Sequence, residues 1–419
     1  MRVQRCKGSR DLIPERMLYF RFVEKAFRKC CLKWGYEEVK TPVLEYLHLF
    51  TSVGTLTPDM LGRVYSFLDW DGWSGQRLVL RPDGTIPVAR MYIDSMGDRK
   101  PARLFYTSNI FRFEETGQES RERWQGGVEL IGAGSNLADV ELIAMSLDAL
   151  HVMGISGVEL KLSHAGLLKG MLSVLGLSEK ERVQVFDRFL DGDREALSRI
   201  DSGDSEINRT ILSVLGLEGK SPGFLRNLRA LFSDAAPELL PLVDDFTATV
   251  ELLDALGREY KIDLTSGRGF EYYTGMIFQL YLSNVKVGGG GRYDDLIPMM
   301  GGGDIPASGF ALYFDCLMEM IENPGRDEAR QKRILVKTGL NSISAGFDIS
   351  DYLRSEGYIA ELILENQDMT DARWLLEVRS SSPLYILRDR VEKRDYELGS
   401  AGEVTKLMGE VNADKDSTS

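Results

Sequence analysis

The sequence predicts an α+β protein with a helical insertion and a small C-terminal α/β domain. Two strand-like runs on either side of a polar loop predict a long hairpin over residues 103–132. Within residues 165–260, apolar residues instead recur at the spacing of helices, with breaks mainly at glycines. Beyond residue 331, short apolar runs alternate with helical segments, as in α/β domains. We therefore expect domains over residues 1–325 and 332–411, with the helical insertion inside the first.

The composition is that of a globular protein with more than one core. The chain has 419 residues, of which 43% are apolar and 27% are charged. Asp and Glu outnumber Lys and Arg by 64 to 51, and an acidic chain is not expected to bind nucleic acid, because phosphate neutralisation needs a basic surface. The N-terminus lacks the apolar stretch of a signal peptide, and no run of eighteen apolar residues occurs. We expect a cytoplasmic protein that does not enter a membrane.

The cysteines and histidines do not predict a metal site. The four cysteines form no C-x-x-C pair, and the chain has three histidines. Their spacing assembles no convincing set of zinc ligands. We expect inert thiols in a reducing compartment, with neither a metal nor another cofactor.

The first elements along the chain are a helix over residues 14–34 and a strand over residues 36–45. Pro42 restricts this strand to an edge, which suits either a subunit interface or a plain sheet edge. The apolar run 78–80 ends in a turn, and we expect Thr85 to cap the helix that follows. A further helix and strand are predicted over residues 136–153 and 158–162.

Polar residues repeat on one face of the predicted hairpin. By the two-residue period of a strand, Arg112 and Glu114 share one face. Gln125, Gly127 and Glu129 share a face on the other arm. This repetition predicts the floor of a ligand site, with a solvated sheet face as the alternative.

Residues 267–275 combine a cation, glycines, a carboxylate and two tyrosines within nine positions. The glycines allow close approach of the backbone to a ligand, and Arg268 could hold a carboxylate or phosphate through a forked pair of hydrogen bonds. Because adjacent residues of a strand face opposite sides, we expect only one of Tyr272 and Tyr273 to line a pocket. A plain strand with a surface arginine is the alternative.

The rest of the chain continues this alternation of strands and helices. Four glycines at 288–291 precede Arg-Tyr-Asp but lack the Lys-Ser/Thr of a phosphate-binding P-loop. We expect residues 307–318 to open a buried helix, residues 388–395 to form a solvated helix or loop, and residues 412–419 to be a disordered tail. Strands are predicted at 262–264, 276–281, 334–337, 359–364 and 384–387, and helices at 345–355 and 370–378.

These motifs occur together and in order, and through them the chain resembles the class II aminoacyl-tRNA synthetases, in particular the histidyl-tRNA synthetase-like group. Residues 35–45 look like the first class II motif, and Phe111-Arg112-Phe113-Glu114 looks like the second. The resemblance covers about the first 320 residues. It implies an antiparallel sheet flanked by helices, with a helical insertion and an anticodon-binding-like α/β domain. The histidine-binding signatures of that group resemble residues 81–85, Gln125 with Glu129, 268–273 and 290–294.

The resemblance also implies how histidine would be held. Asp83 and Glu129 would bind its ammonium group, Arg112 would bind its carboxylate, and Gln125 would help to orient it. The candidate histidine-binding residues are Asp83, Thr85, Arg112, Gln125, Glu129, Arg268, Glu271, Tyr272, Tyr273 and Tyr293.

Residues 268–273 would contact the imidazole side chain of histidine. Tyr273 or Glu271 would lie against the imidazole. Arg268 resembles the catalytic arginine of the synthetases and would here make a polar contact with the ligand.

Two departures from the synthetase pattern fall on the ATP side. Cys316 stands where the third class II motif has an arginine that binds the ATP phosphates, and Tyr313 stands at a glycine position. Losing the guanidinium removes a charge-assisted clamp on triphosphate. Arg123 replaces a phenylalanine that stacks on adenine, although an arginine can also stack on a base. We therefore predict a lost ATP site and assign no catalytic residue.

This split pattern resembles the family of ATP phosphoribosyltransferase regulatory subunits, which are synthetase-like proteins without aminoacylation. The resemblance implies a short-form catalytic subunit as partner, a dimer of this chain within a hetero-octamer, and histidine feedback in the first step of histidine biosynthesis. Residues 331–419 carry 12 Lys and Arg against 16 Asp and Glu, which suits an anticodon poorly. Two alternatives stay open: an active histidyl-tRNA synthetase and a stand-alone histidine-binding pseudo-synthetase.

Overall fold

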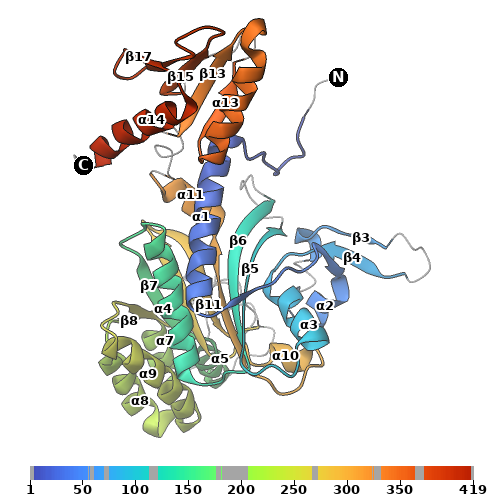
Figure 1. Ribbon diagram of the computed structural model, residues 1–419. Helices are drawn as coiled ribbons and strands as arrows, with labels where there is room; N and C mark the ends of the chain where they lie inside the picture. Colours follow the sequence, from blue (N-terminus) through green and yellow to red (C-terminus); the bar gives the residue numbers. More distant parts are fainter. Residues whose placement is uncertain are drawn as a thin grey trace. The chain divides into compact units, whose positions relative to one another are not determined.

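The computed structural model divides into two compact units, Met1–Glu322 and Asn323–Ser419, which are described separately (Figure 1). Among the residues it describes, no helix combines the length and apolarity needed to cross a membrane. The described residues are 4–54, 56, 61–69, 75–112, 121–175, 181, 206–266, 272–322, 324, 332–363 and 372–416.

The first unit is built on a mostly antiparallel sheet of nine strands. In chain order these are β1 (Glu37–Glu38), β5 (Ala102–Phe111), β6 (Glu122–Ile131), β7 (Glu159–His164), β8 (Glu218–Gly219), β9 (Lys261–Asp263), β10 (Met276–Leu282), β11 (Val285–Arg292) and β12 (Ala307–Tyr313). Their order across the sheet is β1-β5-β6-β12-β11-β10-β7-β9-β8. The pairs β1–β5 and β7–β9 are parallel and the others are antiparallel. This confirms the predicted α+β architecture.

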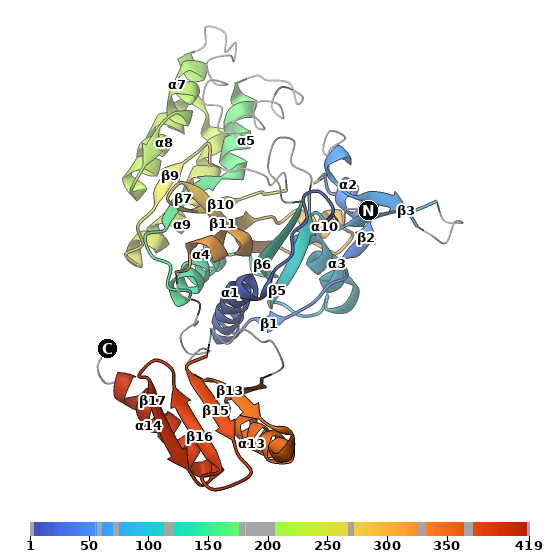
Figure 2. The ribbon, with the colours of Figure 1, turned by 90° about the horizontal axis from the view of Figure 1, so that it is seen from above.

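Two long helices, α1 (Pro14–Lys33) and α4 (Asn136–Val152), cover one face of this sheet (Figure 2). Helix α1 starts at a proline, which is well tolerated in the first turn, and Phe27 on its buried side meets Phe105 of β5 edge to face. Side chains alternate across a strand. Phe105 and Val128 therefore face the helices, whereas Tyr106 and Glu129 lie on the opposite face, where a ligand site can form.

A three-stranded sheet in the order β2-β4-β3 flanks the large sheet. The single strand predicted over residues 36–45 is wrong, because it is divided between β1 in the large sheet and β2 in the small one. Between them, Arg81 Nη1 donates to the carbonyl oxygens of Thr41 and Pro42 at 3.0 and 3.1 Å. Those carbonyls are thus bound by a guanidinium rather than by a neighbouring strand. The elements here are β2 (Leu44–Tyr46), α2 (Leu47–Ser52), η1 (Leu61–Arg63), β3 (Ser66–Leu68), β4 (Arg77–Leu80) and α3 (Thr85–Ser95).

The N-terminus of α3 is capped by Asp83 rather than by Thr85, so the predicted cap is wrong. Asp83 Oδ1 accepts a hydrogen bond from the Ile86 N–H at 2.9 Å, and Thr85 is already the first helical residue. A carboxylate is well suited to this place, because it faces the unpaired N–H groups and the positive end of the helix.

Residues 307–313 form the central strand β12, so the buried helix predicted from residue 307 is wrong. Small residues alternate with Phe310 and Leu312 at the period of a strand, and the helix α11 (Phe314–Met320) begins only after them. The glycine run at 288–291 is likewise not a loop but lies within β11. A Cβ on Gly290 would overlap the carbonyl oxygen of Gly309, so glycine is needed where these strands approach. The short helix α10 (Leu296–Met299) connects β11 and β12.

The predicted helical insertion lies between β7 and β9 and is not wholly helical. The two-residue strand β8 pairs with β9 inside it, and much of the span 176–205 lies outside the described residues. Its helices gather at one end of the first unit (Figure 1). They are α5 (Ala165–Val174), α7 (Glu206–Leu215), α8 (Pro222–Ala235), η3 (Pro237–Leu239) and α9 (Leu240–Ala255).

The second unit is a five-stranded sheet in the order β14-β13-β15-β16-β17, parallel across β14-β13-β15 and antiparallel beyond. The predicted helix over residues 370–378 is wrong, because Trp374–Val378 is a strand whose apolar residues fill the core. The elements are β13 (Arg333–Thr338), η4 (Leu340–Ser342), α13 (Ile343–Ser355), β14 (Ile359–Leu362), β15 (Trp374–Val378), β16 (Tyr385–Asp389), β17 (Arg394–Leu398) and α14 (Ala401–Asp416).

Two further predictions for the second unit are wrong in part. The cluster at 388–395 lies in the β16–β17 hairpin, so the predicted solvated loop holds for the turn with Arg390 and Lys393 but not for the strand residues around it. Its Asp389 is fully buried and pairs with buried Arg373 at 2.6 Å, a contact between strands that local sequence does not reveal. Helix α14 continues to Asp416, so residues 412–416 are helical rather than part of a disordered tail.

The Arg373–Asp389 pair predicts a large effect of one substitution on stability. Asp389→Asn should lower the free energy of unfolding of the second unit by about 3 kcal/mol, because it leaves a buried guanidinium without its counter-charge. Urea unfolding of the full chain, followed by hydrogen exchange of the amides of β15 in the second unit, measures this. Asp395→Asn is the matched control, since Asp395 pairs with Arg388 on the exposed side of the same hairpin and should change nothing measurable. Equal effects of both substitutions would contradict the account.

Candidate functional site

The carboxyl group of Glu129 lies at the centre of the candidate site. Glu129 is only 2% exposed, on the face of β6 that points away from α1 and α4. Its Oε1 accepts a hydrogen bond from Tyr106 Oη at 3.2 Å, and its Oε2 accepts one from Tyr293 Oη. On the neighbouring strand, a Cβ on Gly309 would overlap Glu129 Oε2. The carboxyl group thus has room only because β12 carries a glycine at this position.

The turn before α3 supplies a second carboxyl group and a hydroxyl. The Thr85 side chain lies close enough to Glu129, Tyr106 and Tyr272 to lower the pKa of each of them, whereas the charge of buried Asp83 raises the pKa of the same three residues. The turn lies close to the sheet here, because a Cβ on Gly84 would overlap the Tyr106 ring. The structure therefore brings together candidates from two segments that are about 45 residues apart in the sequence.

Three tyrosines form an aromatic wall beside these carboxyl groups. The Tyr272 ring meets that of Tyr293 edge to face with centroids 5.5 Å apart, and it lies 5.3 Å from the ring of Tyr273. The expectation that Tyr272 and Tyr273 point to opposite faces of a strand is wrong, because their rings lie side by side. Residues 272–275 are not a strand, so the rule that adjacent side chains point to opposite faces does not apply to them.

The buried carboxyl groups of this site have too little positive charge around them to keep their pKa values low. Removal from water raises the pKa of Glu129 to about 8, despite the hydrogen bonds that favour its ionised form. Burial also raises the pKa of Asp83, although the nearby Arg112 guanidinium opposes that shift. A cationic group bound between these two carboxyl groups would favour their ionised forms. The site is therefore suited to an ammonium ion.

The remaining described candidates, Arg112 and Gln125, lie around the carboxyl groups of Glu129 and Asp83. Arg112 is half-buried and its Nε donates to the Pro82 carbonyl oxygen at 2.6 Å, which leaves other nitrogens of its guanidinium for a ligand. Gln125 Nε2 lies 3.4 Å from Tyr106 Oη. Arg268 and Glu271 fall outside the described residues. Tyr106 was not a candidate, although it lies opposite Gly127 on the polar face of the hairpin, where the strand period could have identified it.

The positions on the predicted ATP side also lie together. Tyr313 pairs with Gln125 across β12 and β6. Burial raises the pKa of its hydroxyl to about 12, while Arg112 and Arg123 act in the opposite direction. Burial also raises the pKa of the Cys316 thiol, which Arg123 and Arg10 again oppose. Tyr313 thus occupies the sheet surface next to the amino-acid candidates, where a glycine would leave space.

An ion pair that sequence reasoning missed lies beside Tyr313 and Cys316. Arg10 pairs with Asp315 of α11, and Asp315 Oδ2 accepts the Trp124 N–H at 2.9 Å. Farther along the same face, Gln279 Oε1 accepts hydrogen bonds from Tyr281 Oη at 2.5 Å and from Ser266 Oγ at 3.0 Å. These polar groups already satisfy one another within the chain.

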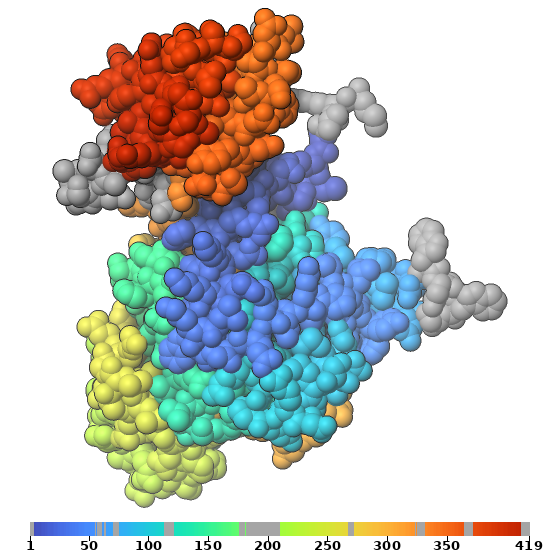
Figure 3. Space-filling model, viewed as in Figure 1, coloured from blue at the N-terminus to red at the C-terminus, as the bar shows by residue number. Residues whose placement is uncertain are grey.

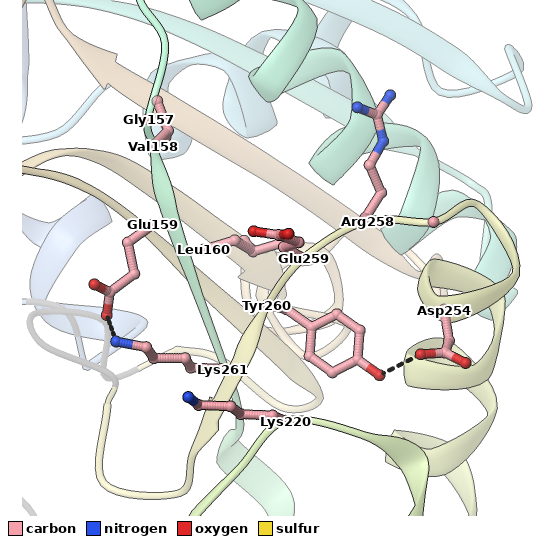
Figure 4. Close-up of a pocket in the computed structure, with 11 residues that line it drawn as sticks. Gly157, Val158, Glu159, Leu160, Lys220, Asp254, Arg258, Glu259, Tyr260 and Lys261 are labelled. Atoms are coloured by element: carbon pink, nitrogen blue, oxygen red, sulfur yellow. Dashed lines mark hydrogen bonds and ion pairs between the residues drawn. The ribbon is translucent and has the colours of Figure 1, made fainter.

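A cavity of about 690 Å³ lies elsewhere, between the start of β7, β9 and the end of α9 (Figure 4). Two of its polar pairs are already made, Glu159 with Lys261 at 3.0 Å and Tyr260 with Asp254 at 3.2 Å. None of the candidate histidine-binding residues lines it. Among the described residues, no group of three or more His, Cys, Asp or Glu side chains could hold a metal ion.

Comparison with known proteins agrees with this fold. The family model for histidyl-tRNA synthetase matches residues 8–317. The chain is 49% identical to the ATP phosphoribosyltransferase regulatory subunit of Dehalococcoides mccartyi over 412 residues, which cover 98% of this chain and 100% of that protein. It is 34% identical to the histidine–tRNA ligase of Methanosarcina acetivorans over 366 residues, or 84% of each chain.

A solved structure is similar to this chain as well. The crystal structure of an ATP phosphoribosyltransferase regulatory subunit/histidyl-tRNA synthetase from Bacillus halodurans superposes with a TM-score of 0.74 at 27% identity, covering 88% of this chain and 94% of that one. The resemblance drawn from the motifs is confirmed. The chain belongs to the histidyl-tRNA synthetase family and, within it, to the ATP phosphoribosyltransferase regulatory subunits.

Proposed function

We propose that this chain activates a short-form ATP phosphoribosyltransferase catalytic subunit and carries histidine feedback in the first step of histidine biosynthesis. One observation supports this most directly. The buried carboxyl groups of Glu129 and Asp83 remain together with their tyrosines, whereas Cys316 and Tyr313 occupy positions that serve ATP in the synthetases. A protein that senses an amino acid needs the first set and has no use for the second.

Histidine would bind with its ammonium group between Asp83 and Glu129. Arg112 lies within electrostatic range of Asp83 and would bind the carboxylate through the part of its guanidinium that Pro82 does not use. Gln125 would orient the ligand from the strand. Thr85 would connect the two carboxyl groups, because its backbone N–H faces Asp83 and its side chain faces Glu129.

The remaining candidates would complete the pocket around the ligand. The rings of Tyr272, Tyr273 and Tyr293 would enclose the imidazole. Arg268 and Glu271 would supply further polar contacts.

The small sheet supports self-association. Leu44 and Tyr46 lie on one exposed face of β2, while Glu45 between them is buried and binds Arg90 at 2.7 Å. Figure 3 shows that the first hundred residues, coloured blue to cyan, form one continuous part of the surface of the first unit. We propose that this face joins two copies of the chain, and that such dimers and catalytic subunits build a hetero-octamer in the cytoplasm. The apolar side chains exposed on this face are Leu44, Tyr46 and Phe67.

The first experiment measures phosphoribosyl transfer by the short catalytic subunit alone, with this chain, and with this chain across a histidine series. We expect little activity alone, activation by an equimolar amount of this chain, and inhibition by histidine. Glu129→Gln should keep the activation but need at least tenfold more histidine, because a charged hydrogen-bond partner of the ammonium is lost. Glu259→Gln, at an exposed position remote from the site, is the matched control.

The outcomes separate the alternatives. Lack of activation together with histidine binding would indicate the stand-alone pseudo-synthetase. Efficient charging of tRNA with histidine would indicate an active synthetase. Either result would contradict the proposed function.

A second experiment tests the dimer. Leu44→Glu places a charge on the exposed face of β2 and should convert the dimer to a monomer in sedimentation, since an unpaired charge is costly in an apolar interface. Leu231→Glu on α8 is the matched control, because Leu44 and Leu231 are 43% and 44% exposed. A dimer that survives Leu44→Glu, or a monomeric parent chain, would show that this face does not join two copies.

A third experiment tests the pKa of Glu129. Because burial raises the pKa of Glu129 to about 8, most chains hold this proton at pH 7, and a bound ammonium would favour its release. Histidine binding at pH 7 should therefore release roughly one proton per chain, and the release should decline toward pH 8.5. Calorimetry in buffers with different ionisation enthalpies counts these protons. Equal heats in all buffers at pH 7 would mean that histidine binding does not ionise Glu129, which would contradict this prediction.

A further inference from the structure

The aromatic wall of the site is carried by a short segment without regular structure, residues 272–275. On one side this segment is held by β11. The Thr274 and Gly275 N–H groups donate to the Arg292 carbonyl oxygen at 2.9 and 3.4 Å, and Thr274 Oγ1 accepts from the Asp294 N–H at 3.0 Å. The position of Tyr272 and Tyr273 therefore depends on the backbone contacts of these four residues.

On its other side the segment is held by the first turns of α5, the opening helix of the insertion. The Ala165 N–H donates to the Gly275 carbonyl oxygen at 2.8 Å, and Lys169 Nζ donates to the Tyr273 carbonyl oxygen at 2.9 Å. A Cβ on Gly166 would lie 2.8 Å from the Thr274 carbonyl oxygen, so the helix and the segment approach as closely as glycine permits. Three consecutive carbonyl groups of the segment thus face α5.

The start of α5 is fixed in turn by His164 and Asp245. His164 Nδ1 accepts the Leu167 N–H at 3.0 Å and caps the helix. A nitrogen that accepts carries no proton, so Nε2 must carry it and donate to Asp245 Oδ2, which lies 3.0 Å away on α9. Asn136 Nδ2 of α4 donates to the same aspartate. A chain of contacts therefore leads from α9 through α5 to the aromatic wall.

We infer that Lys169 and His164 are positioning residues of the pocket, which hold segment 272–275 against Glu129 and so let the helical insertion set the affinity for histidine. This inference rests on the proposed function, in which the pocket holds histidine. Neither residue needs to touch the ligand. A displacement of α5 by a few tenths of an ångström would move the Tyr273 carbonyl group, and with it the rings of Tyr272 and Tyr273, which pack against Tyr293.

The test uses the full chain with Lys169→Met, which keeps the length of the side chain and removes the ammonium. Mass spectrometry measures hydrogen exchange of the amides of residues 272–282 without ligand, and calorimetry measures histidine binding. We expect faster exchange at Thr274 and Gly275 and about tenfold weaker binding. Lys169→Arg retains a donor and should restore both readouts. Lys220→Met, at an exposed lysine of the same insertion, should change neither.

The outcomes distinguish this inference from the proposed function. If the parent chain binds histidine and Lys169→Met exchanges and binds like the parent, the positioning role is excluded. If exchange rises but the affinity stays the same, the insertion does not set the affinity, which also overturns the inference. Absence of histidine binding by the parent chain would instead contradict the proposed function, and the exchange data would still decide whether Lys169 positions the segment.

Discussion

The burial of the Glu129 carboxyl group is the constraint on which the rest of the site depends. A carboxyl group removed from water is unstable as an anion unless donors or a counter-charge surround it. Here Tyr106, Tyr293 and Thr85 supply hydrogen bonds but no positive charge, and the pKa remains about 8. The ammonium group of a ligand would therefore stabilise the ionised form of Glu129. The glycine at position 309 in β12 exists to make room for the Glu129 carboxyl group.

The two sides of the candidate site differ in how their polar groups are arranged. Around Glu129 these groups form a closed set of hydrogen bonds in which each member needs the others, so losing one leaves a buried polar group unpaired. On the other side, Tyr313 takes up space on the sheet and Arg10 pairs with Asp315, contacts that are satisfied within the chain.

Sequence reasoning predicted the hairpin, the long helices and most of the candidate site, because period and motif order are local signals. It failed where contacts between residues distant in the sequence determine the local structure. Residues 370–378 have no helix-breaking signal, yet the core of the second unit requires a strand there. The sequence predicts a strand at Tyr272 and Tyr273, but residues 272–275 have no regular structure, so their rings do not point to opposite faces. Tyr106 and the contacts from α5 to residues 272–275 depend on positions that only the folded chain brings together.

The measurement that tests this account most directly is histidine-dependent exchange of pyrophosphate into ATP, made on the same preparation in which histidine binding is measured by calorimetry. The account predicts that histidine binds to the pocket around Glu129 and that no exchange occurs, because Cys316 and Tyr313 leave no clamp for the triphosphate. Histidine-dependent exchange at the rate of a synthetase would contradict the account, since it would require both halves of the site to work.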